Sequence, residues 1–190
     1  MTPTVLVVGE AAGGHLNGAT IEAIGVGIAL GGSTVVGFVA RSGAASAAAE
    51  FGRFGIRSAY AVDDPRLDAA PGAARVPALH RVAEKAGASV LVVGGTTLGR
   101  DLLSRMAVAW DAAVATGVTE VTAVEGGLRV RRPIFGGRAT ETRRLEGAHL
   151  GVAIRPHAFE IPAEKPVTCA VTTLPPAEIP AALLAPQRGA

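Results

Sequence analysis

The run over residues 89–109, SVLVVGGTTLGRDLLSRMAVA, constrains the fold more than any other stretch of this sequence. It begins with a continuous apolar segment, turns through a loop of glycine and threonine, and then enters a charged helical segment. A continuously apolar strand is typical of a parallel sheet that is buried on both faces. A small-residue loop between such a strand and a helix is the unit from which nucleotide-binding α/β sheets are built. The run therefore predicts an α/β fold.

Strand-like and helical segments alternate in the same way through the first part of the chain. In the segment 19–30, Ile21, Ile24 and Ile28 recur at spacings of three and four, as on one face of a helix. Because apolar strand-like and helical segments alternate, we expect a three-layer parallel sheet with helices on both faces. The predicted strands are residues 4–8, 33–40, 58–62 and 89–93, and the predicted helices are residues 19–30, 44–54, 73–86 and 98–113.

The alternation of strands and helices stops after Gly117. Strand-like segments then follow one another without helices between them, and glycine pairs at 126–127 and 136–137 predict hairpin turns. We therefore expect an added antiparallel section near the C-terminus, followed by a last edge strand. The antiparallel section comprises residues 119–124, 128–134, 140–145 and 150–155, the edge strand residues 167–172, the domain residues 1–173, and a proline-rich tail or linker residues 174–190.

Composition excludes several classes of protein. The single cysteine, Cys169, permits no intrachain disulfide and no cysteine metal cluster, and we interpret it as a small buried hydrophobe. No histidine has metal-ligand spacing and no nucleophile elbow is present, so we expect no metal site and no catalytic residue. The net charge of +2 does not argue for nucleic acid. Without a signal peptide or a span of about 18 apolar residues, we expect a cytoplasmic protein with no membrane insertion.

The loop after the strand 89–93 is the candidate cofactor-binding site. It lies at the carboxyl end of a predicted central strand, where open α/β sheets bind ligands, and the next helix would offer free N–H groups to an anion. Thr96 or Thr97 could be the N-cap of that helix. Two interpretations stay open, a capped tight turn and a ligand or partner contact. The candidate residues are Gly94, Gly95, Thr96, Thr97 and Gly99.

A second glycine-containing loop, residues 9–14, fits neither the dinucleotide fingerprint nor a phosphate loop, and we interpret it as a surface turn. The antiparallel section is rich in arginine. Strand alternation places Arg129 and Arg131 on one face and Arg132 on the other. This charge predicts a solvated face, or a docking surface for an acidic partner or for a flavin pyrophosphate held by another domain. Nucleic acid is disfavoured because no aromatic residues interleave with the arginines.

Several segments together carry a family resemblance. VLVVGE at residues 5–10 and LNGATIEAI at 16–24 resemble the opening strand and helix of the α subunit of electron-transfer flavoproteins. GGTTLGRDL at 94–102 is followed at the family spacing by Arg105. RPIFGG begins at Arg132 and RPHAF begins at Arg155. In order and spacing, residues 4–160 resemble the N-terminal domain of that subunit.

The resemblance implies an adenine-nucleotide α-hydrolase-like fold in an electron carrier component rather than an enzyme. The carrier would pass electrons from flavin dehydrogenases to an acceptor, with this domain supplying scaffold and subunit contacts. In the family a further domain holds most of the FAD, and this chain contains no match to its motifs. FAD is therefore expected only in a complete assembly and not on this chain alone. The expected partner is a β-like subunit or a second copy, and Arg105, Arg132 and Arg155 are candidate interface or anion contacts.

Two alternatives of the same fold stay open. One is a stand-alone adenine-nucleotide-binding module that uses the loops 9–14 and 94–99 at one sheet edge. The other is a purely structural homodimer. The proline-rich end is compatible both with a piece of an α subunit and with a stand-alone relative.

Overall fold

The computed structural model describes residues 3–31 and 34–175. Within them, seven strands form one sheet in which every neighbouring pair is parallel, in the order β12-β5-β4-β1-β6-β11-β7. The central strands are apolar throughout, as the sequence predicted for a sheet covered on both faces. The strands are β1 Val5–Gly9, β4 Val35–Arg41, β5 Ser58–Asp63, β6 Val90–Gly94, β7 Ala112–Val118, β11 His149–Ile154 and β12 Ala170–Thr173.

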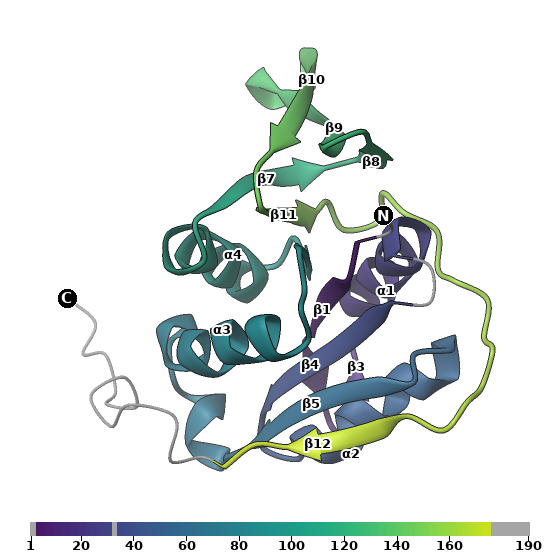
Figure 1. Cartoon of the computed structure of the whole chain (residues 1–190), viewed down its shortest axis with the longest axis vertical. Helices are drawn as coiled ribbons and strands as arrows, with labels where there is room; N and C mark the ends of the chain where they lie inside the picture. Colours follow the sequence, from purple (N-terminus) through teal and green to yellow (C-terminus); the bar gives the residue numbers. More distant parts are fainter. Residues whose placement is uncertain (1–2, 32–33, 176–190) are drawn as a thin grey trace.

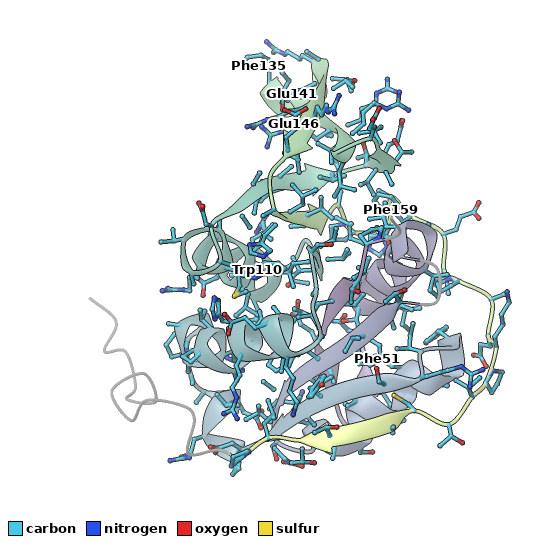
Figure 2. All side chains as sticks on the ribbon, in the orientation of Figure 1. Phe51, Trp110, Phe135, Glu141, Glu146 and Phe159 are labelled. Carbon is cyan, nitrogen blue, oxygen red and sulfur yellow. The ribbon has the colours of Figure 1, made fainter. Side chains whose placement is uncertain are left out.

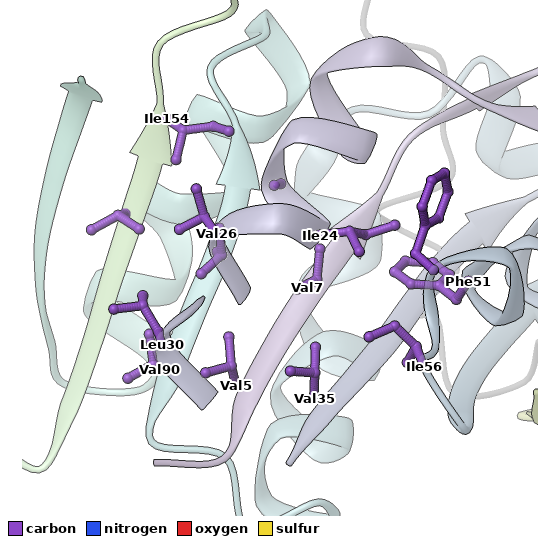
Figure 3. Packing of buried hydrophobic residues seen from close by; sticks show 14 of the residues in the cluster. Val5, Val7, Ile24, Val26, Leu30, Val35, Phe51, Ile56, Val90 and Ile154 are labelled. Atoms are coloured by element: carbon purple, nitrogen blue, oxygen red, sulfur yellow. The ribbon is translucent and has the colours of Figure 1, made fainter. Parts of the chain in front are cut away.

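Four α-helices cover the two faces, so the predicted three-layer α/β architecture is confirmed (Figure 1). On one face, α1 and α2 pack against Val5, Val7 and Val35; Figure 3 shows this core closing around Ile24 and Phe51. On the other face, α3 and α4 enclose a second apolar core. The helices are α1 Gly18–Gly31, α2 Ala44–Ala49, α3 Val76–Lys85 and α4 Thr97–Ala109.

The sequence predicted four helices in the right places but with imperfect bounds. The segment predicted as one helix over 44–54 is α2 followed by a 3-10 helix, Glu50–Phe54, and α3 is preceded by a 3-10 helix, Gly72–Arg75. The predicted helix 98–113 ends at Ala109, and residue 112 already begins β7. Asp111 has a φ of 47°, a left-handed conformation that breaks the helix. The alanine-rich sequence AAVAT hides this strand, because alanine favours helices.

A small antiparallel sheet follows β7, as predicted. It contains β8 Glu120–Val124, β9 Gly127–Ile134 and β10 Ala139–Glu146, in the order β10-β9-β8. Both predicted hairpin turns connect these strands. One face of the small sheet is buried against the parallel sheet through Leu128, Val130 and Leu145, and the other faces solvent. The sheet projects beyond the three layers at the top of Figure 1.

The prediction that residues 150–155 belong to the antiparallel section was wrong. These residues form β11, which lies between β6 and β7 and is parallel to both. The run LGVAI is apolar on both faces and is buried from Leu150 to Ile154, as a central parallel strand requires. The small sheet is therefore an excursion between β7 and β11.

Beyond β11 a long strap, residues 155–169, crosses the α1 and α2 face and leads to β12 at the sheet edge (Figure 1). The predicted edge strand is thus confirmed, shifted to Ala170–Thr173. Leu174, predicted as the first residue of the tail, is buried and donates its N–H to the carbonyl of Ala61 at 2.7 Å. The rest of the predicted tail lies outside the described residues, except Pro175.

Candidate functional site

The candidate cofactor-binding loop joins β6 to α4 at the carboxyl edge of the parallel sheet. Thr96 has extended backbone, and its hydroxyl accepts a hydrogen bond from the N–H of Gly99 at 2.9 Å. A threonine in this position satisfies one of the N–H groups that the first turn of a helix leaves free. The predicted N-cap is therefore confirmed as Thr96, and Thr97 is the first residue of α4.

Close packing accounts for the glycines of this loop. A Cβ atom on Gly95 would overlap the carbonyl oxygen of Ile154, and one on Gly99 would overlap the carbonyl oxygen of Gly94. Gly94 itself lies against Ala19 of α1. Only glycine lets backbone segments approach this closely. The role of these residues as ligand contacts stays a prediction.

Glu10, directly after β1, reaches the same place from the neighbouring strand. Its carboxylate accepts a hydrogen bond from the hydroxyl of Thr96 at 2.5 Å, and its N–H donates to Thr20 Oγ1 at 2.8 Å. Burial raises the pKa of Glu10 above its usual value, although the Thr96 hydrogen bond and the nearby Arg75 charge oppose the shift. A carboxylate beside the amino end of α4 is placed favourably in the field of the helix dipole.

A cleft of about 300 Å³ opens at this edge between β1, β4 and α4. Its walls combine apolar side chains with acids and arginines. Leu98 of the loop 94–99 lines the cleft, whereas the lining residues do not include the five candidate residues of that loop. This is the edge at which open α/β sheets bind ligands. The lining residues are Val8, Gly9, Glu10, Ala11, Ala12, Asn17, Phe38, Ala40, Arg41, Asp68, Arg75, Leu98 and Leu102.

The charges of the cleft are satisfied within the chain. The buried guanidinium of Arg75 donates to the carbonyl of Ala40 in β4 and to that of Leu67 in the segment after β5. Burial lowers the pKa of Arg75 from its usual value. Arg41 lies 3.7 Å from the carboxylate of Asp68. Two acids thus face two arginines, so the cleft offers little unused positive charge to a phosphate.

The three arginines predicted as interface or anion contacts lie in separate elements. Arg105 forms an ion pair with Asp101 one turn earlier on α4, at 2.8 Å. Arg132 on β9 contacts Glu141 at 2.6 Å, and Arg155, just after β11, is exposed. Arg132 and Arg155 nevertheless both bond to β7. The Arg132 guanidinium donates to the carbonyl of Thr116, and the backbone N–H of Arg155 donates to the carbonyl of Val118. Their contact with a partner or an anion stays a prediction.

The solvent face of the small sheet is basic and polar. Arg129 and Arg131 point outward on β9, whereas Arg132 is on the opposite face, as strand alternation predicted. Arg131 pairs with Glu120 at 2.9 Å, but Arg129 has no side-chain partner among the described residues. Threonines from the outer strands complete a groove of about 290 Å³. They are Thr122, Thr140 and Thr142.

Glu22 is a buried acid that is not among the candidate site residues predicted from the sequence. It is 4% exposed on α1 and accepts hydrogen bonds from the N–H groups of His157 at 3.0 Å and Phe159 at 3.3 Å. It thereby fixes the first residues of the strap against the helix. The sequence does contain a clue to its role, because Glu22 is the one charged residue of α1.

Comparison with known proteins agrees with the fold and the motifs. Residues 5–179 match the family described as "Electron transfer flavoprotein domain". This chain belongs to that family. The resemblance predicted from the sequence motifs is therefore confirmed over most of the chain.

Two curated proteins are similar to this chain in sequence. It is 26% identical over 161 residues to electron transfer flavoprotein subunit alpha of Bacillus subtilis (strain 168), covering 84% of this chain and 50% of that protein. It is 32% identical over 130 residues to protein FixB of Azorhizobium caulinodans, covering 66% of this chain and 35% of FixB. The chain thus spans half the length, or less, of these two relatives.

FAD is the cofactor that a flavoprotein family implies, and the cleft is the site at the sheet edge that could receive it. The cleft volume of about 300 Å³ is at the low end for small-molecule sites. Phosphates bind cations and free N–H groups, and in the cleft Arg75 is bonded to carbonyls while the charge of Arg41 is offset by Asp68 at 3.7 Å. The residues of the cleft therefore do not fit the whole cofactor. Among the helices in the described ranges, none is long and apolar enough to cross a membrane.

Proposed function

We propose that this chain is the α-type domain of an electron transfer flavoprotein that works in the cytoplasm and carries electrons from flavin dehydrogenases to an acceptor. The family match over residues 5–179 is the observation that carries this proposal. The part played by this domain is mainly structural. It supplies a scaffold and contacts with a β-type subunit, while FAD belongs to the complete assembly.

The small sheet is the surface that supports subunit contact best. One face packs on the parallel sheet through Leu128 and Val130, and the other presents Arg129 and Arg131 to solvent. Arginine is enriched at protein interfaces because its planar guanidinium makes several hydrogen bonds at once. Exposed sheet edges also invite pairing with another chain. Arg132, which joins this sheet to β7, would hold the surface in place.

Association is the measurement that tests the proposal. We expect the chain, produced together with an electron transfer flavoprotein β subunit of the same organism, to sediment at micromolar concentration as a complex heavier than the 19.0 kDa chain. Arg129→Glu should weaken the complex about tenfold or more, because it reverses charge at the interface. Arg100→Glu reverses an exposed arginine on α4 and is the matched control.

Two outcomes would contradict the proposal. One is a single 19.0 kDa species that ignores the added β subunit. The other is a homodimer without affinity for that subunit, which would favour a structural homodimer instead.

A further inference from the structure

Phe135 is the most unusual exposed side chain of the small sheet. It lies at the turn between β9 and β10 and is 79% exposed, at the far end of the sheet from the three layers (Figure 2). The described residues contain two other large, mostly exposed apolar side chains, Val108 on α4 and Ile161 in the strap, and both are aliphatic. An aromatic ring gives a large apolar contact at low entropic cost, and such rings are enriched among interface hot spots.

The backbone at this turn is strained in a way that a glycine would relieve. Phe135 has a φ of 50°, and Gly136 and Gly137 follow with φ values of 66° and 91°. Glycine is the residue that adopts this left-handed region without steric cost, whereas a bulky side chain is an outlier there. The first of three left-handed positions therefore carries a phenylalanine at the expense of stability. Backbone outliers of this kind are associated with functional sites.

The hairpin that carries the ring is held in one conformation. β9 and β10 pair without interruption from Ile134 opposite Ala139 to Gly127 opposite Glu146. The Arg132–Glu141 ion pair at 2.6 Å crosses this pairing near the tip. A preorganised hairpin pays little ordering entropy when it binds.

The charge around the ring defines the partner surface that fits it. Arg138, three residues after Phe135, is exposed and has no side-chain partner among the described residues. A complementary surface would receive the ring in an apolar pocket and offer carboxylates around the rim, because interfaces match potential as well as shape.

We infer that Phe135 is the anchor of the small sheet, inserting into an apolar, acid-rimmed pocket of the β-type subunit. This inference rests on the proposed function, which supplies the partner. A second copy of the chain is disfavoured because a two-fold interface at the hairpin tip would bring the Arg138 side chains of both copies together. The anchor role explains why a strained turn keeps a bulky, solvent-exposed ring.

If Phe135 is an anchor, removing its ring changes binding and stability in different directions. Phe135→Gly should leave the melting temperature unchanged or raised, since it relieves the backbone strain. The same variant should weaken binding to the β subunit about tenfold or more, as expected for loss of a hot-spot aromatic. Phe135→Tyr keeps the ring and should bind like the unaltered chain. Val108→Ala truncates an equally exposed apolar side chain on α4 and is the matched control.

The readouts are the dissociation constant by calorimetry and the melting temperature of each variant alone. Arg138→Glu should also lower affinity, and more strongly at low salt. If the unaltered chain binds the β subunit and Phe135→Gly binds equally well, the anchor role is overturned while the proposed function stands. If the unaltered chain does not bind, the proposed function fails first. Loss of self-association, rather than of β binding, in Phe135→Gly would overturn the choice of partner.

Discussion

At the scale of single residues, the carboxyl edge of the sheet depends on contacts between segments far apart in sequence. The N-cap role of Thr96 could be predicted, because the signal is local: a threonine just before a helix and a glycine three residues later. Its second partner, Glu10, is 86 residues away, and Glu22 meets the strap 135 residues away. No local pattern encodes such pairs, so the sequence alone could not place these two acids.

Glu10 gives a pH-dependent prediction. Burial raises the pKa of Glu10 in the folded chain. Between the usual glutamate pKa and this raised pKa, the folded state therefore binds more protons than the unfolded state. The unaltered chain should therefore lose stability over that window. Glu10→Gln keeps an acceptor for Thr96 but does not titrate, so its stability relative to the unaltered chain should increase with pH.

Urea unfolding at several pH values, followed by the fluorescence of the single tryptophan, Trp110, measures this difference. A stability difference that is the same at about pH 4 and about pH 8 would contradict the assignment.

At the scale of elements, the sequence predicted the alternating strands and helices of the first hundred residues well, because their apolar periodicity is local. It failed where an element's position depends on distant neighbours. The strand at 150–155 is apolar enough for a central strand, but its insertion between β6 and β7 follows from the whole sheet. The β7 strand was missed because its alanines also suit a helix and its start is set by the left-handed Asp111.

The strap gives the prediction at this scale. Glu22→Ala removes the acceptor of two backbone N–H groups, those of His157 and Phe159, and leaves them unsatisfied beside α1. We expect the free energy of unfolding to fall by about 3 kcal/mol, because hydrogen bonds to a charged acceptor contribute about 1.5–3 kcal/mol each. Urea unfolding measures the loss.

Glu160→Ala is the matched control for this variant, since it removes an exposed acid from the same strap and should change stability by less than about 0.5 kcal/mol. Equal effects of the two substitutions would show that Glu22 does not fix the strap.

At the scale of the whole molecule, the cleft and the small sheet differ in what they offer to a ligand or a partner. Its parallel sheet ends in a cleft whose positive groups are already paired, and its most distinctive surface is the projecting small sheet. The two relatives are at least twice as long as the part that this chain matches. The paired charges of the cleft and the projecting small sheet are the features that support the proposed scaffold role.

The purified chain alone should therefore be colourless. FAD carries a pyrophosphate, and in the cleft the charge of Arg41 is offset by Asp68 at 3.7 Å while Arg75 is bonded to carbonyls, so little positive charge is left for it. The cleft of about 300 Å³ is also small for such a ligand.

Visible absorption after gel filtration, with mass spectrometry of anything released on denaturation, measures bound flavin directly. An electron transfer flavoprotein purified in the same way is the positive control. Stoichiometric flavin on the isolated chain would mean that the paired arginines rearrange to admit the cofactor, and the scaffold role would have to be abandoned.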